Sequence, residues 1–262
     1  MQKRGQVTIF VIIGILIIVS ILLFLFLRSR VYLGPGTILD LEQEFPQIEE
    51  HIQECLLEAV EPRIIQMGLQ GGFIRTPDGT FRQYQGNKVS YLCYNIRDQP
   101  FCRSRILTIP NMEAEISEFV KRDIESQCLN IAGFGKIGYD IIEGPLEITT
   151  DIGDDKIIIT ANIPITIIKG ANKAERSEFS TSINLPLGRL YNAAHDIVNT
   201  EAISGFSDTL LYSVAKTQTT NKPYIIQKLQ PYPDKLYIAK IKDVPSEDDP
   251  FIFQFFIEGE PR

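Results

Sequence analysis

The sequence KIIITANIPITII, residues 156–168, indicates the fold class more firmly than any other stretch of the chain. Isoleucine or alanine occupies every second position, and mostly polar residues stand between them. This alternation is typical of a strand with one face in the core and one toward solvent, the usual arrangement in antiparallel sheets. Residues 170–173 form a turn signal and residues 178–185 alternate again, which predicts a long hairpin. Pro164 cannot donate to a ladder, so we expect it at a bulge or a sheet edge.

The remaining elements are predicted from apolar spacing. Apolar residues recur every three or four positions over residues 39–67, 111–130 and 187–216, which predicts three amphipathic helices. Pro62 should kink or break the first helix, and Gly205 should break the third. Short apolar runs predict strands at residues 88–94, 224–229, 235–242 and 251–258. This order of elements predicts an α+β fold in which antiparallel strands pack with amphipathic helices.

Two glycine-proline sites suggest how the chain is divided. Gly34-Pro35-Gly36 predicts a stalk or hinge over residues 31–38. Gly144-Pro145 would separate a helix-rich, cysteine-bearing subdomain (39–143) from a β-rich subdomain with one helix (144–262). A loop within a single domain is the alternative, and both interpretations stay open.

The four cysteines are Cys55, Cys93, Cys102 and Cys128. An even number predicts disulfides in an oxidising compartment, with three possible connectivities, and free core thiols are the alternative. Cys93 and Cys102 lie close together in the sequence, while Cys55 and Cys128 lie on the apolar faces of two predicted helices. We therefore favour the pairs Cys93–Cys102 and Cys55–Cys128. The spacing of a zinc site is missing, and we expect no metal and no cofactor.

An uncharged apolar run begins at Val7 and ends at Leu27. At about 1.5 Å per residue a helix of this length spans roughly 30 Å, the thickness of a bilayer's hydrocarbon core. We therefore expect residues 1–30 to form a leader and a transmembrane helix, with the lipid bilayer as a partner. Lys3, Arg4 and the amino group outnumber the two arginines after the run, which predicts a cytoplasmic N-terminus and an extracytoplasmic C-terminal domain.

Charge limits the partners of that domain. The chain has a net charge of −7, and four of its 26 basic residues but none of its 33 acidic residues lie in residues 1–30, which leaves −11 for the rest. A surface of this sign repels phosphate backbones, so we expect no nucleic acid partner.

The residues Lys3-Arg4-Gly5-Gln6-Val7-Thr8, directly before the apolar run, resemble the class III signal of archaeal type IV pilin-like proteins. The resemblance implies that a prepilin-type peptidase cuts between Gly5 and Gln6 and that the apolar helix is then retained. The family usually carries a glutamate four positions after the glutamine, where this chain has Phe10. That acid helps subunits register in a filament, so its replacement favours roles other than filament assembly.

Other motifs do not define a catalytic site. The string GFGKIG at residues 133–138 matches a dinucleotide pattern, but a predicted helix precedes it and a strand follows, the reverse of the required order. The acidic stretch 151–155 fits a hairpin turn better than a calcium loop. His51 and His195 lack an accompanying nucleophile or metal-binding partner in the sequence, so we interpret them as ordinary helix residues.

Aromatic residues are concentrated near the end of the chain. Alternation places Phe251, Phe253 and Phe255 on one strand face, where a core position is the simplest interpretation. The alternative is a sticky surface for a partner, with Phe256 or Tyr232 exposed.

These observations predict a membrane-anchored, extracytoplasmic, pilin-like surface protein with a structural, adhesive or interaction role. The alternative is an anchored extracellular module that recruits a protein or ligand without forming filaments. Protein partners or self-association are expected in either case. An enzymatic activity has no motif in its favour.

Overall fold

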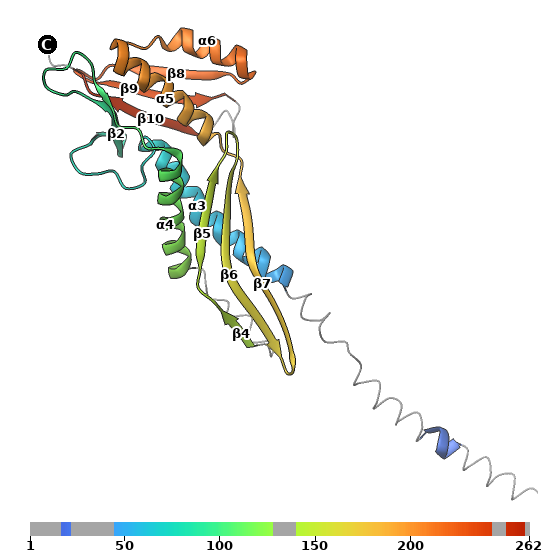
Figure 1. Ribbon diagram of the computed structural model, residues 1–262. Coiled ribbons are helices and arrows are strands. Elements are labelled where there is room, and N and C mark those ends of the chain that lie inside the picture. Colours follow the sequence, from blue (N-terminus) through green and yellow to red (C-terminus); the bar gives the residue numbers. More distant parts are fainter. Residues whose placement is uncertain (1–16, 22–44, 128–139, 243–249, 260–262) are drawn as a thin grey trace, which may run out of the picture.

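The protein folds into two β-sheets connected by helices (Figure 1). The computed structural model describes residues 17–21, 45–127, 140–242 and 250–259. One sheet has six strands and the other has four. Helices cover both sheets, and one long helix reaches from one sheet to the other.

The six-stranded sheet combines segments that are far apart in the sequence. Its order is β1 (Phe81–Tyr84), β2 (Asn87–Tyr94), β10 (Ile252–Ile257), β9 (Lys235–Ile241) and β8 (Tyr224–Leu229), and β3 (Arg103–Ser104) also pairs with β2. β10 runs antiparallel to β9 but parallel to β2. The prediction of antiparallel strands alone is therefore wrong, and the fold is mixed α/β. The physical reason is that β10 is buried on both faces, a pattern that suits a central strand with two neighbours.

The sheets also cut across the predicted division at residue 144. β2 precedes this position and β10 follows it, yet the two strands are neighbours in one sheet. β4 (Asp140–Glu143) and β5 (Glu147–Ile152) lie on either side of residue 144 and pair with the same strand.

The four-stranded sheet is built around the predicted hairpin. β6 (Ile157–Lys169) pairs with β7 (Asn172–Ile183) along one edge and with β4 and β5 along the other. Every second residue of β6 is buried from Ile157 to Ile167, so the alternation is confirmed. The β6–β7 register shifts between Asn162 and Ile165, which confirms the expected bulge at Pro164. On the other side of the bulge, the Pro164 carbonyl accepts a hydrogen bond from the Gly144 amide at 2.7 Å.

Helix α3 (Phe45–Leu69) reaches from one sheet to the other. The Gln53 side chain donates to the Ser180 carbonyl of β7 at 3.1 Å, and the Leu69 carbonyl accepts from Gln254 of β10 at 2.9 Å. The helix continues through Pro62, so of the two predicted effects, a kink or a break, the break does not occur. Proline has no amide hydrogen, so the Glu58 carbonyl one turn earlier loses its usual helical donor. Pro62 and Glu58 are both exposed, so water can donate to that carbonyl.

Three more helices complete the covering of the sheets. α4 (Ile109–Gln127) packs along β5 and α3, and α5 (Leu187–Ser204) packs on β9 and β10. α6 (Thr209–Thr220) lies beside β8. Gly205 ends α5 in the left-handed conformation, φ 70°, so the predicted interruption at this glycine is confirmed.

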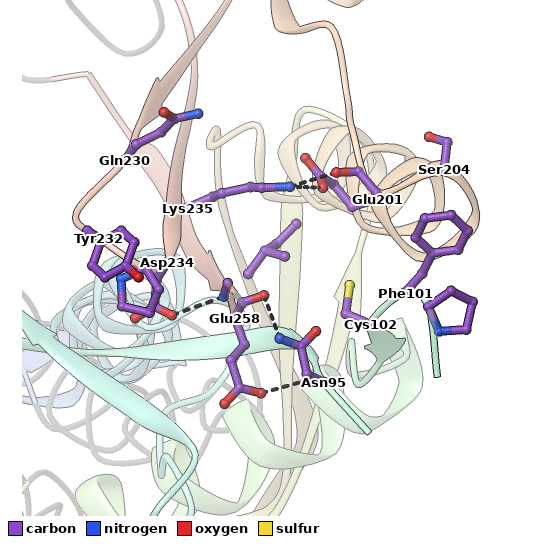
Figure 2. Close-up of a pocket in the computed structure, with 15 residues that line it drawn as sticks. Asn95, Phe101, Cys102, Glu201, Ser204, Gln230, Tyr232, Asp234, Lys235 and Glu258 are labelled. Carbon is purple, nitrogen blue, oxygen red and sulfur yellow. Dashed lines mark hydrogen bonds and ion pairs between the residues drawn. The ribbon is translucent and has the colours of Figure 1, made fainter. Parts of the chain in front are cut away.

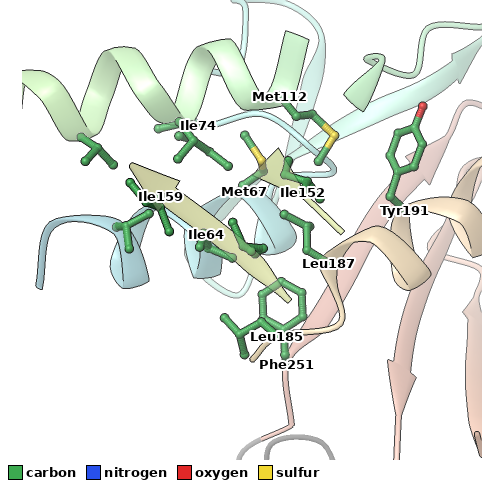
Figure 3. Packing of buried hydrophobic residues seen from close by; sticks show 14 of the residues in the cluster. Ile64, Met67, Ile74, Met112, Ile152, Ile159, Leu185, Leu187, Tyr191 and Phe251 are labelled. Atoms are coloured by element: carbon green, nitrogen blue, oxygen red, sulfur yellow. The ribbon is translucent and has the colours of Figure 1, made fainter. Parts of the chain in front are cut away.

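The core runs without interruption between the two sheets. Met67 of α3, Met112 of α4 and Leu187 of α5 come together there, next to Ile152 (Figure 3). Gly188 allows α5 to begin this close to the β5–β6 turn, because a Cβ at Gly188 would lie 2.4 Å from the Gly153 carbonyl oxygen. The start of α5 is thus fixed by backbone contact.

The expected transmembrane helix is not part of the fold that the structure describes. None of the helices within the described ranges is both long and apolar enough to cross a bilayer. Of the apolar run from Val7 to Leu27, only residues 17–21 are described, as a short helical stretch with exposed side chains. The longer helices are amphipathic and carry charged residues on the face that points away from the core.

The strand β6 offers a matched pair of substitutions that tests its orientation. Ile159 is fully buried and its neighbour Ile158 is 36% exposed on the opposite face. We expect Ile159→Ala to lower the free energy of unfolding by about 2–5 kcal/mol, because it leaves a cavity. Ile158→Ala should cost less than about 1 kcal/mol, and urea denaturation of both variants measures the difference. Equal losses would contradict the assigned faces.

Candidate functional site

A pocket of about 660 Å³ lies at one end of the six-stranded sheet, among the residues that the structure describes (Figure 2). Four segments surround it: residues 95–102 after β2, the C-terminal end of α5, the β8–β9 turn and the end of β10. This pocket was not predicted, because its segments become neighbours only when β10 inserts between β2 and β9. Its volume lies in the usual range of about 300–1,000 Å³ for small-ligand sites.

A disulfide fixes one wall of the pocket. Cys93, fully buried in β2, is bonded to Cys102, with Cα atoms 5.4 Å apart. The predicted Cys93–Cys102 pair is therefore confirmed. Cys55 is also disulfide-bonded, whereas Cys128 lies outside the described residues, so the second predicted pair stays a prediction.

A buried carboxylate fixes the opposite wall. Asp234, at the start of β9, is 5% exposed and accepts from the Arg82 guanidinium at 2.6 Å and from the Tyr91 hydroxyl at 2.7 Å. Its other oxygen accepts from the Gly259 amide at 3.1 Å. Burial and the hydrogen bond to Asp234 raise the pKa of Tyr91 far above its ordinary value, so this hydroxyl remains a donor. The β8–β9 turn is thereby tied to β1, β2 and the end of β10.

A second buried carboxylate lies on the α5 side. Glu201 is 1% exposed, and Lys235 and Lys228 pair with its two oxygens, Lys228 at 3.4 Å. The Tyr237 hydroxyl and the Ser207 amide also donate to it. Burial and the bond to Glu201 raise the pKa of Tyr237 well above its ordinary value.

The Glu201 cluster anchors the C-terminal end of α5 to the sheet. Lys235 also donates to the Gly205 carbonyl at 2.7 Å, which places a cation at the negative end of the helix. The sequence analysis did not predict this cluster. Glu201 could have indicated it, because this acidic residue lies on the apolar stripe of the predicted helix, one turn after Ile197 and Val198.

Aromatic side chains form part of the pocket rim. Phe101 is 40% exposed and Tyr232 is 66% exposed, and the two lie on opposite sides of the pocket in Figure 2. A Cβ at Gly205 would lie 3.1 Å from the Phe101 ring, so this glycine makes room for the aromatic wall. Phe256, the other residue expected to be exposed, is buried under the Arg82 guanidinium. The core prediction for Phe251, Phe253 and Phe255 is confirmed.

A second surface feature adjoins the end of α5. Large apolar side chains there are exposed by 47% to 75%. We name this set the apolar α6 face, and it consists of Ile203, Phe206, Leu210, Leu211 and Val214. No residue of α6 is buried, so this helix turns one face to β8 and leaves the apolar face open.

The residues considered for catalysis or metal binding are occupied by structural contacts. His195 stacks on Tyr191 and lies 3.2 Å from the Asn199 amide. Asp155 forms a two-point ion pair with Arg189, which lowers the pKa of this carboxyl. Among the described residues, no three metal-ligating side chains gather. Gly5, Gln6 and the glycine string at 133–138 lie outside the described residues.

Comparisons with known proteins gave no match: no family model, no curated protein and no solved structure is similar to this chain. The geometry of the pocket and of the apolar α6 face therefore carries the functional argument.

The Glu201 cluster generates a stability prediction. Glu201→Leu removes the carboxylate that pairs with Lys228 and Lys235 and accepts from the Tyr237 hydroxyl, and we expect a loss of about 3 kcal/mol in the free energy of unfolding. Glu118→Leu removes an exposed i,i+4 pair with Arg122 and should change it by less than about 1 kcal/mol. Urea denaturation monitored by near-UV circular dichroism compares the two, and similar values would show that the cluster stabilises nothing.

Proposed function

We propose that this chain is an extracytoplasmic surface protein, attached to a membrane by its N-terminal apolar segment, whose copies associate through the apolar α6 face. The observation that carries the proposal is an exposed apolar helix face on an acidic chain. The proposed role is interaction and assembly at the cell surface.

Charge restricts where a second copy can make contact. The chain has a net charge of −7, so two copies repel each other over most of their surface. α6 carries a single charged residue, Lys216, which pairs with Asp196 at 2.9 Å. Leu210 and Leu211 are 75% and 67% exposed, and the nearest carboxylate, Asp208, is bound to their backbone amides, so this region opposes a second copy less than the rest of the acidic surface does.

Symmetry and membrane attachment support the same occupant. In a two-fold arrangement the face meets an identical face, so apolar residues oppose apolar residues automatically. The face has five residues, fewer than the roughly 20–30 per side of a standard interface, so the association should be weak in solution. Attachment to one membrane raises the effective concentration of the copies, which makes a weak contact effective.

A second candidate function is assembly of a pilin-like filament. It is favoured by the leader Lys3-Arg4-Gly5-Gln6, which resembles a class III signal and would be processed by a prepilin-type peptidase. Phe10, in place of the usual glutamate, favours the first candidate instead.

Self-association can be tested with charge introduced on the apolar α6 face. Sedimentation equilibrium of the full chain in detergent should show a concentration-dependent dimer. The variant Leu210→Glu/Leu211→Glu should weaken dimerisation by at least tenfold, because four carboxylates would meet at the interface.

The control places one carboxylate on an exposed apolar residue of a different surface. Ile142 of β4 is 57% exposed and far from α6, so Ile142→Glu should leave the dimerisation constant unchanged. A chain that stays monomeric at every concentration, both in detergent and in vesicles, would refute the proposed association.

The proposed location can be tested through the cysteines. None of the described cysteines is free, so a membrane-impermeant maleimide should label intact cells only after reduction. Mass spectrometry of the same sample reports whether the N-terminus begins at Gln6. Cysteines that react only after lysis would place the domain in the cytoplasm and rule out a surface role.

A further inference from the structure

We infer that the pocket between Phe101 and Tyr232 is a binding site for neutral carbohydrate, a short uncharged oligosaccharide of a surface glycan. This inference goes beyond the proposed self-association and does not depend on it. It is carried by the chemistry of the pocket wall and by the way that wall is held in place.

The two exposed rings provide apolar platforms. Phe101 comes from the disulfide-closed loop and Tyr232 from the β8–β9 turn, and the rings lie on opposite sides of the pocket (Figure 2). An aromatic face matches the C–H face of a sugar ring. Burial of the exposed ring against such a ligand removes apolar surface from water, and this makes the free energy of binding more favourable. A rim of this kind suits a ligand with an apolar face and polar edges.

The remaining wall is rich in hydrogen-bonding groups. Asn95, Gln230, Ser204 and Glu258 contribute amide, hydroxyl and carboxylate groups. The Asn95 backbone amide donates to the Glu258 carboxylate at 2.7 Å and its side-chain amide donates to the Glu258 carbonyl at 3.4 Å, so the polar side of the wall is itself held in place. Small-ligand sites usually combine apolar walls with a few polar groups that point at the ligand. The hydroxyl groups of a sugar can both donate hydrogen bonds to these polar groups and accept hydrogen bonds from them.

Charge argues against an anionic ligand. Lys235 is the cation of the pocket wall among the described residues, and its ammonium group is already bound to Glu201 and to the Gly205 carbonyl. Glu258 adds an exposed negative charge. A phosphate or sulfate would therefore meet a carboxylate and no uncommitted cation, whereas a neutral polyhydroxyl compound avoids this repulsion.

The pocket is held rigid on three sides. The Cys93–Cys102 bond positions Phe101, the Asp234 cluster holds the turn that carries Tyr232, and the Glu201 cluster fixes the end of α5. Because the disulfide and the two charged clusters already fix the pocket wall, a ligand does not have to order these loops when it binds. The entropic cost of binding is therefore lower.

The test uses the full chain in phospholipid nanodiscs, because sugar-headed detergents would compete for the site. The probe is an array of neutral hexose and N-acetylhexosamine oligosaccharides, with sialylated and sulfated glycans beside them, followed by titration calorimetry of the best neutral glycan. We expect binding to neutral glycans. Tyr232→Ala and Phe101→Ala should each weaken it by about tenfold or more, and Tyr232→Phe should retain it because the ring remains.

Tyr94→Ala is the matched control, since Tyr94 is an exposed tyrosine of β2 outside the pocket wall, and it should leave affinity unchanged. Near-UV circular dichroism confirms the fold of each variant. The inference is overturned if no neutral glycan binds, if only acidic glycans bind, or if Tyr232→Ala/Phe101→Ala binds as tightly as the unaltered chain. None of these outcomes bears on dimerisation, which is measured separately.

Discussion

The insertion of β10 between β2 and β9 is the constraint on which the rest of the structure depends. It joins the last described strand of the chain to one that is more than a hundred residues earlier. The Glu258 amide then donates to the Cys93 carbonyl at 2.9 Å, and the disulfide loop is placed beside the β8–β9 turn. The pocket exists only because of this strand order. The same strand stacks Phe255 on Tyr237 and so aligns the sheet with α5.

The buried charges of the domain are better explained by positioning than by stability. A buried ion pair gains little net free energy, because desolvation of both partners offsets their attraction. Glu201 and Asp234 are nevertheless almost fully buried, and both carboxylates line the same pocket. Asp234 holds the β8–β9 turn against the sheet, and Glu201 holds the end of α5 against it, each through hydrogen bonds of defined geometry. Apolar residues at these positions would fill space but would not fix the loop that carries Tyr232 in the same way.

Sequence patterns predicted what is local in this fold and missed what is long-range. The alternation of β6, the bulge at Pro164 and the interruption at Gly205 follow from the residues at those positions. The parallel β2–β10 pair depends on contacts between distant segments, which no local period reveals. Whether Pro62 breaks α3 depends on which face of the helix is exposed, and that is a property of the packed molecule. Phe256 was considered as an exposed contact because the covering Arg82 comes from a different strand.

The two candidate surfaces lie where a partner can reach them. α3 begins at Phe45 near the end of the four-stranded sheet, and α6 lies at the other end of the molecule (Figure 1). The six-stranded sheet is thus at the opposite end of the molecule from the start of α3 (Figure 1). The apolar α6 face and the pocket are both on that part, and both include the end of α5. Two copies paired through α6 would therefore present two pockets on one assembly, and two weak glycan contacts would combine into a stronger attachment.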